Sequence, residues 1–153
     1  MSQIDKKALN IAFRILTYRS RTRKQLAEKM AEKQVSEEQI ELICDYMEER
    51  RFIDDYDYAK NLQAGLVSRG YGTLKIKNEL KCKGIDPELA GQVMEEMPDT
   101  DERLYEFIRK KCNGLDVSDP GTRKKVFDAC ARRGFGFEQI KSAFYRLFNA
   151  DEY

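Results

Sequence analysis

Basic side chains at helical spacing are the residues of this sequence best suited to chemistry, and that chemistry is the binding of anions. The stretch RGYGTLKIKNELKCK, residues 69–83, holds five basic residues and one acidic residue, although the whole chain carries 28 basic and 27 acidic residues. Lys77 and Lys81 are four residues apart and share one face of a helix, whereas Lys75 is placed to pair with Glu79. Phosphates are neutralised by such a basic face. Such a helix fits a polyanion, and it fits equally a solvated face whose charges pair with acidic helices of the same chain.

Residues that could support catalysis or metal binding are few. The chain has no histidine, and its four cysteines form no CxxC pair, so neither a histidine-based nucleophile nor a zinc site is expected. The acidic run DDYDY, residues 54–58, is typical of a helix N-terminus, where the dipole favours carboxylates. Cys82 lies between two lysines that could lower its pKa, but a reduced surface or half-buried thiol is the simpler interpretation. We therefore predict no enzyme, no cofactor and no metal.

The basic stretch belongs to a repeat with a period of fifty residues. Residues 19–36, 69–86 and 119–136 align without a gap, and the register extends to Met47, Met97 and Leu147. Apolar and basic residues recur at matching positions, which indicates three copies of one structural unit. The matching positions are Leu26, Ile76 and Val126; Met30, Leu80 and Cys130; Lys33, Lys83 and Arg133; and Val35, Ile85 and Phe135.

Each copy is expected to contain a leading helix followed by two helices that are joined by a tight turn. The chain is therefore predicted to be all-α, with three tandem three-helix repeats of the helix-turn-helix type. We place the repeats at residues 1–53, 54–98 and 99–153, and their leading helices at about 5–18, 54–68 and 100–112. Residues 113–121 are expected to form a loop, and residues 95–101 are the expected hinge between the second and third repeats.

Capping residues support these helices. Thr22 and Gln25 have the spacing of a capping box at the start of the second helix of the first repeat. Gly72 and Gly84 fit the N-cap and C′ positions of the matching helix in the second repeat. Gly70, Gly72 and Gly84 are predicted to be structural, because they permit turns that a β-carbon would hinder.

Charge is segregated along each repeat. Residues 19–33 hold six basic and two acidic residues, and residues 119–133 hold five and two. Residues 34–48 and 84–98 hold five and four acidic residues, respectively, and no basic one. Two interpretations stay open: the basic helices form a track for a polyanion, or they pair with the acidic helices of the same chain.

Two aromatic residues lie near the basic helices. Tyr71 and Phe135 each adjoin a glycine, and such rings could stack on nucleic-acid bases. Packing in the core or in a turn is the simpler role for both of them.

Three stretches in order resemble the RecX family of bacterial regulators of the RecA recombinase. SRTRKQLAEKM, ERRFIDDYDYA and RGYGTLKIKNELKCKGI are similar to signatures of that family, and ARRGF extends the likeness weakly into the third repeat. Thr22 and Gln25 stand where the family usually has Ser and Glu, and both replacements preserve a capping box. The third repeat carries few family markers, which leaves the role of its basic residues open.

The resemblance implies a function. RecX-like proteins are elongated, curved chains of three-helix repeats that bind the groove of the RecA–DNA filament. They inhibit its ATPase, strand exchange and extension, within DNA repair, recombination and the SOS response, and they are not enzymes. The implied partners are the RecA filament and single- or double-stranded DNA of any sequence. The charged N-terminus does not resemble a signal peptide and no apolar run could span a bilayer, so we expect a cytoplasmic location and no membrane partner. We expect a monomer because each unit can bury its apolar stripe against its neighbours.

Charge and position nominate the contact residues. We expect the second basic helix to contribute most, then the third, then the first. The candidates are Arg69, Lys75, Lys77, Lys81 and Lys83; Lys124, Lys125, Arg132 and Arg133; and Arg19, Arg21, Arg23 and Lys24. Two alternatives stay open: a sequence-specific helix-turn-helix DNA regulator, and a helical-repeat scaffold that binds only protein. If the protein is such a scaffold, we expect it to have no salt-dependent affinity for DNA.

Overall fold

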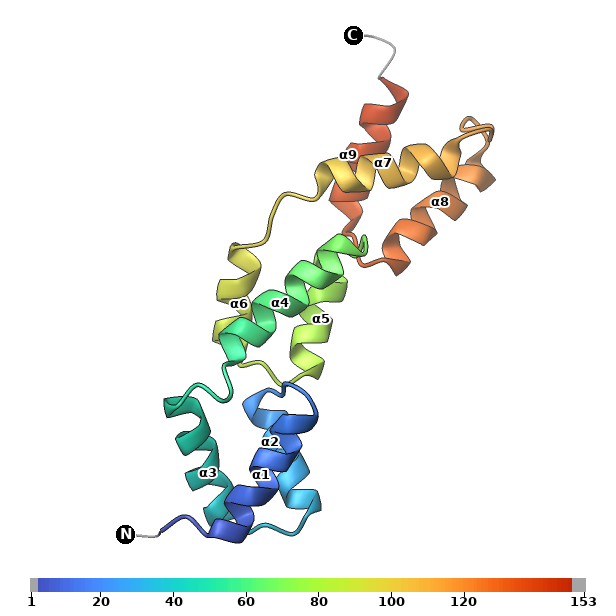
Figure 1. Cartoon of the computed structure of the whole chain (residues 1–153). Coiled ribbons are helices and arrows are strands. Elements are labelled where there is room, and N and C mark those ends of the chain that lie inside the picture. Colours follow the sequence, from blue (N-terminus) through green and yellow to red (C-terminus); the bar gives the residue numbers. More distant parts are fainter. Residues whose placement is uncertain (1–2, 150–153) are drawn as a thin grey trace. The chain divides into compact units, whose positions relative to one another are not determined.

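The computed structural model describes residues 3–149, and within them it contains nine helices and no strand (Figure 1). This confirms the all-α prediction. None of these helices is long and apolar enough to cross a membrane. Residues 1–2 and 150–153, which the predicted first and third repeats include, lie outside the described part. The helices are α1 (Lys6–Tyr18), α2 (Arg23–Glu32), α3 (Glu37–Glu49), α4 (Asp55–Ser68), α5 (Thr73–Cys82), α6 (Pro87–Glu95), α7 (Asp101–Cys112), α8 (Pro120–Arg132) and α9 (Phe137–Phe148).

Backbone contacts divide the chain into two compact units. The first unit contains the residues up to 61 together with 80–93, and the second contains 62–79 together with the residues from 94 onward. Helices α4 and α5 each contribute to both units, so the middle repeat is shared between them.

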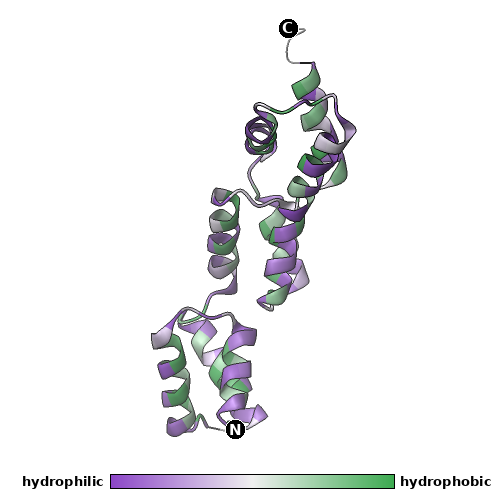
Figure 2. Ribbon diagram, turned by 90° about the vertical axis from the view of Figure 1, so that its right-hand side faces the viewer, coloured by the Kyte–Doolittle hydropathy of each residue, from purple (hydrophilic) through white to green (hydrophobic). Residues whose placement is uncertain are grey.

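The first unit has its core among α1, α2 and α3. Each of these helices is amphipathic, and apolar and polar residues alternate along the ribbons (Figure 2). The apolar faces bury a single cluster, which extends to Ile53, two residues before the start of α4. Its members are Ala8, Ala12, Leu26, Met30, Ile43, Cys44, Met47 and Ile53.

The second unit has its core among α7, α8 and α9. Its members are Leu104, Ile108, Cys112, Val126, Cys130, Phe135, Ile140, Ala143 and Phe144. Residues that match across the repeat occupy matching buried sites in both cores. Leu26 and Val126 are both buried, as are Met30 and Cys130, and so are Ile76 and Leu80 on α5. The fifty-residue register is therefore a register of core positions.

A left-handed residue ends the middle helix of every repeat. Gln34, Gly84 and Gly134 have φ angles of 66°, 82° and 93°. In each turn the next residue donates its backbone N–H to the carbonyl five residues earlier, at 3.1, 3.1 and 3.3 Å. This is the Schellman arrangement, and it confirms that Gly84 is the C′ residue of α5.

Side-chain caps fix the starts of the helices. The Thr22 hydroxyl accepts a hydrogen bond from the Gln25 N–H at 3.2 Å, and Gln25 Oε1 accepts one from the Thr22 N–H at 3.1 Å. The predicted capping box is therefore confirmed. The Asp54 carboxylate accepts from the N–H of Asp57 at 3.1 Å, as expected for acidic residues at a helix N-terminus.

The loop before α8 is shorter than predicted. Asp119 caps α8 by accepting the Gly121 N–H at 3.3 Å, and Pro120 is the first helical residue. The expected loop over residues 113–121 therefore ends two residues early, because proline at the first position of a helix gives up no hydrogen bond and already has a helical φ.

The four cysteines are expected to differ sharply in reactivity. Burial raises the pKa of Cys44 and of Cys130 to about 11, and it also raises that of Cys112, whereas Cys82 is exposed. A thiol attacks as the thiolate, so a rise of about two pKa units slows it about a hundredfold at pH 8, before access is considered. We expect Ellman's reagent to titrate one thiol per native chain and all four in urea. Cys82→Ser should abolish the native reaction, and rapid labelling of a second cysteine would contradict the burial.

Candidate nucleic-acid interface

The start of α2 lies against the turn between α5 and α6, and we call this contact the first junction (Thr22, Lys24, Lys83 and Gly84). The Thr22 hydroxyl, which is fully buried, donates to the backbone carbonyl of Lys83 at 2.7 Å. A Cβ on Gly84 would lie 2.4 Å from Cδ of Lys24, so the lysine stem packs directly on the glycine. The junction therefore places a cation of the first repeat beside a cation of the second.

The start of α5 lies against the turn between α8 and α9, and we call this contact the second junction (Gly72, Leu74, Lys75, Arg133 and Gly134). The backbone N–H groups of Gly72 and Leu74 donate to the carbonyls of Arg133 and Gly134 at 2.7 and 2.8 Å. A Cβ on Gly72 would lie 2.7 Å from the Gly134 backbone, and one on Gly134 would lie 2.4 Å from Cβ of Lys75. The predicted structural role of Gly72 is therefore confirmed, and it includes this close approach of two backbones.

The two junctions are copies of one contact. Thr22 matches Gly72 in the fifty-residue alignment, and Lys83 matches Arg133. The donor is a side-chain hydroxyl in the first junction and a backbone N–H in the second. Both bonds nevertheless end on the carbonyl of the residue just before the left-handed glycine. The basic segments of successive repeats therefore meet end to start, once in each unit.

Cations surround the ring of Tyr71 beside the second junction. The charged groups of Arg69, Lys75 and Arg133 lie 5.8, 5.8 and 6.0 Å from its centroid, and Arg133 Nη1 also donates to the Arg69 carbonyl at 3.3 Å. An aromatic face attracts cations. Lys75 pairs with Glu79 at 3.1 Å, which confirms the predicted pairing. Three cations and one carboxylate leave a net positive group, which suits a phosphate.

Phe135 does not act as a platform for bases. It is a member of the core of the second unit and is only 3% exposed. The prediction that it could stack on nucleic acid is therefore wrong, and the alternative role in packing is confirmed. Its ring is drawn inward because the turn that contains Gly134 directs the next residue toward the core.

The two lysines that share a face of α5 are available to a partner. Lys77 and Lys81 are exposed, and neither forms an ion pair within residues 3–149. On α8, Lys124 is exposed but pairs with Asp128 at 2.9 Å. The positive charges on this face of α5 are therefore less neutralised by ion pairs than that of Lys124 on α8.

Arg23 is occupied by its own unit. Its guanidinium lies 2.9, 2.9 and 3.0 Å from carboxylates of Glu41, Asp45 and Glu48 on α3. The backbone N–H of Arg23 donates to the carboxylate of Asp55 at 2.8 Å. Burial alone would lower the pKa of Arg23, but the hydrogen bonds and charges of α3 outweigh it and raise that pKa above its ordinary value. The charge of Arg23 is therefore neutralised by pairing between the basic helix α2 and the acidic helix α3, and we propose that the role of Arg23 is structural.

The other nominated cations differ in exposure. Arg21 is only 9% exposed, and its Nε has no hydrogen-bond partner within the described residues. Half-buried cations are Lys75, Lys83 and Arg133. Exposed cations are Arg19, Lys24, Arg69, Lys77, Lys81, Lys124, Lys125 and Arg132.

Two residues of α7 that the sequence did not place at the interface, Arg103 and Phe107, lie near the cations around Tyr71. Arg103 Nη1 donates to the carbonyl of Val67 at 3.1 Å, and the ring of Phe107 lies 4.4 Å from the guanidinium carbon of Arg133. Phe107 therefore helps to hold Arg133 in place. No signal in the sequence could have found them, because α7 lies outside the charged segments that recur.

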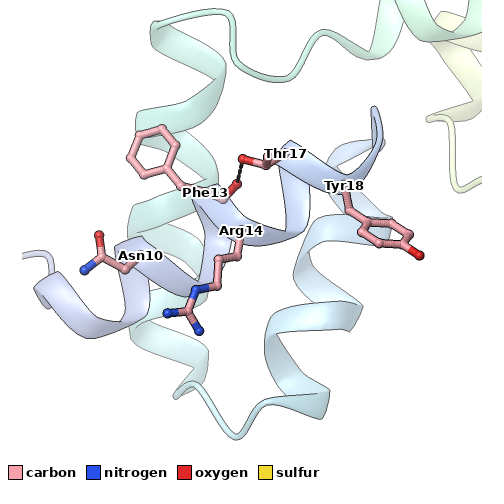
Figure 3. Close-up of a pocket in the computed structure, with 5 residues that line it drawn as sticks. All are labelled: Asn10, Phe13, Arg14, Thr17 and Tyr18. Carbon is pink, nitrogen blue, oxygen red and sulfur yellow. Dashed lines mark hydrogen bonds between the residues drawn. The ribbon is translucent and has the colours of Figure 1, made fainter.

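A pocket along α1 offers no comparable grouping. Asn10, Phe13, Arg14, Thr17 and Tyr18 line it, and all of them come from one helix (Figure 3). The Thr17 hydroxyl donates to the carbonyl of Phe13 at 2.7 Å, and Tyr18 points to the opposite side from Phe13. The polar groups do not converge on one point, as they would at a site of catalysis.

Fold and junctions together define a class: a tandem array of three-helix units whose basic segments meet at repeated contacts. Three family models match the chain in order. They describe the first, second and third three-helix domains of RecX, and they match residues 8–47, 54–94 and 99–144.

Relatives agree with these models. The chain is 33% identical to the regulatory protein RecX of Chlorobium limicola, over 90% of this chain and 87% of that protein. It is 30% identical to the regulatory protein RecX of Chromohalobacter salexigens, over 86% and 87%. A crystal structure of RecX from Lactobacillus salivarius shares the fold, with a TM-score of 0.83 at 24% identity over 92% of this chain and 94% of that one. The chain belongs to the RecX family of regulatory proteins.

Proposed function

We propose that this protein binds the RecA–DNA filament and inhibits the ATPase, strand-exchange and extension activities of RecA, as a regulator and not as a catalyst. The relatives are named regulatory proteins. Its partners would be the RecA filament and DNA of any sequence, in the cytoplasm. We also propose that the repeats divide at 53/54 and 98/99, which lie between the segments that the family models match.

The observation that carries the proposal is the repeated junction. In each unit a basic segment from one repeat meets the basic turn of the next, which leaves lysine and arginine side chains from two repeats close together. A filament presents phosphates and acidic side chains at regular intervals, so cations repeated at structurally equivalent places can engage several of them at once. Such contacts weaken as the salt concentration rises.

The test is the single-stranded-DNA-dependent ATPase of the cognate RecA, with this protein added below stoichiometry. We expect strong inhibition by the unaltered protein and at least about tenfold weaker inhibition by Lys77→Glu with Lys81→Glu, since each lost charge-assisted contact is worth about 1 kcal/mol or more. The matched control is Lys6→Glu with Lys7→Glu, which reverses two exposed lysines of α1 that lie outside the three basic segments. No inhibition by folded protein at equimolar amounts would overturn the proposal.

Salt-dependent binding to duplex DNA separates the alternatives. A sequence-specific regulator would prefer one sequence strongly over competitor DNA, whereas the filament regulator would show weak, sequence-independent affinity that falls as salt rises. Absence of any such affinity, together with intact ATPase inhibition, would assign the binding energy to RecA itself.

A further inference from the structure

An apolar groove lies between α8 and α9, and we call it the aromatic groove (Phe127, Phe137, Phe144 and Phe148). It encloses about 360 Å³, and four of the seven described residues that line it are phenylalanines. Phe137 is 61% exposed and Phe148 is 43% exposed. Burial of a phenylalanine ring is favourable, so rings left open to water in a concave surface point to a partner that covers them.

The spacing of the groove residues defines its length. Phe137, Lys141, Phe144 and Phe148 recur along one face of α9 at steps of four, three and four residues. At 1.5 Å per residue this face is about 16 Å long, which equals about three turns of a helix. Phe127 of α8 closes the other wall, with its ring centroid 5.5 Å from that of Phe137. The groove is therefore long enough for one short helix.

The rim of the groove is basic. Arg123, Lys124 and Lys141 line it together with the four rings, and among residues 3–149 no acidic residue does. Lys124 pairs with Asp128, but exposed Lys141 forms no ion pair within residues 3–149. The guanidinium carbon of Arg123 lies 6.0 Å from the ring centroid of Phe148, at one end of the groove. Apolar rings between cations are complementary to a helix with an apolar stripe and acidic flanks.

Two other occupants fit less well. A base needs a free ring face on which to stack, but Phe144 is buried and Phe127 packs edge-on against Phe137. A second copy of this chain would have to offer an acidic helix with an exposed apolar stripe. The acidic helix α3 has its stripe, Ile43 and Met47 included, in the core of the first unit.

We propose that the aromatic groove binds an acidic amphipathic helix of another protein. The apolar residues of that helix would enter between the rings, and its carboxylates would pair with Lys141 and Arg123. This surface is separate from the two junctions, and the proposal does not depend on the function proposed above.

The test uses a fluorescein-labelled peptide of about fifteen residues, with leucines at the i, i+4, i+7 and i+11 positions and glutamates elsewhere, and the full-length protein. We expect anisotropy to show saturable binding. A scrambled peptide of the same composition, or one with lysine in place of glutamate, should bind at least about tenfold more weakly, since the apolar stripe or the charge complementarity is lost.

Matched variants locate the binding. Phe137→Ser and Lys141→Glu should each weaken the peptide about tenfold or more, since they remove an anchor or reverse a pairing charge. Tyr145→Ser and Lys110→Glu are the controls, because Tyr145 is 72% exposed on α9 and Lys110 is exposed on α7, and neither lines the groove. Lys141→Glu changes only an exposed charge, so it keeps the test valid if Phe137→Ser fails to fold.

Three results would overturn the proposal. One is equal binding of the scrambled peptide. Another is peptide binding that neither groove variant changes, while both variants weaken labelled oligothymidylate, which would make the groove a nucleic-acid site. The third is self-association in sedimentation that Phe137→Ser abolishes, which would make a second copy the occupant.

Discussion

Replacing Gly134 with alanine is expected to destabilise the second unit by about 3 kcal/mol. A φ of 93° costs an L residue about 1–2 kcal/mol. The new Cβ would also lie 2.4 Å from Cβ and 2.5 Å from the backbone nitrogen of Lys75, and overpacking of this kind costs about 1–3 kcal/mol. The backbone cannot rotate away, so α5 must move and its hydrogen bond to the Gly134 carbonyl is lost. Urea unfolding followed by circular dichroism measures the change.

The chain offers two matched controls for this effect. Gly114 has a φ of 77° but open space around its Cβ position, so Gly114→Ala should show the backbone cost alone, about 1–2 kcal/mol. Gly136 has an ordinary negative φ and open space, so Gly136→Ala should cost about 1 kcal/mol or less, as a change at an N-cap. Equal losses for Gly134→Ala and Gly114→Ala would show that the close approach to Lys75 is absent.

Local features of this fold were accessible from the sequence. The period of fifty residues identified buried positions such as Leu26 and Val126, and the spacing of Thr22 and Gln25 identified a capping box. Both follow from interactions within one or two helical turns, where residue spacing determines which groups can meet. The left-handed turn at Gly84 was predicted for the same reason.

Contacts between distant segments were not accessible in this way. Gly72 reads as an N-cap in sequence, but its second role depends on Arg133 and Gly134, some sixty residues away. Charge counts likewise placed Arg23 among the contact residues, although three carboxylates of α3 surround it. Charge runs specify which side chains are available but not which partner each one finds, because that depends on how the helices pack.

The equivalence of the junctions gives the basic segments a mechanical role as well as an electrostatic one. Lys83 and Arg133 each supply a backbone carbonyl that holds a neighbouring repeat, while their side chains remain half exposed. The same residue thus connects repeats and presents charge. Loss of a junction bond should therefore displace cations without removing any of them.

Thr22→Val tests that coupling at the first junction. Valine keeps the shape of threonine, whose side chain is fully buried, but lacks its hydroxyl. The N–H of Gln25 therefore loses its cap and the carbonyl of Lys83 loses its donor, both at half-buried residues. A lost cap costs about 1 kcal/mol, and a buried group left unpaired costs about 1–3 kcal/mol. We expect a loss of about 2 kcal/mol in urea unfolding, together with weaker inhibition of the RecA ATPase by protein that is still folded.

Thr22→Ser separates the hydroxyl from the shape of the side chain. Serine keeps both hydrogen bonds and loses one methyl group, so it should cost about 1 kcal/mol and leave ATPase inhibition unchanged. If Thr22→Val protein, shown to be folded at the assay temperature, inhibits as well as the unaltered protein, the alignment of Lys24 with Lys83 does not matter for binding. In that case the exposed lysines of α5 must act without the first junction. If inhibition falls while every cation is still present, the geometry that the repeat imposes is part of the binding site.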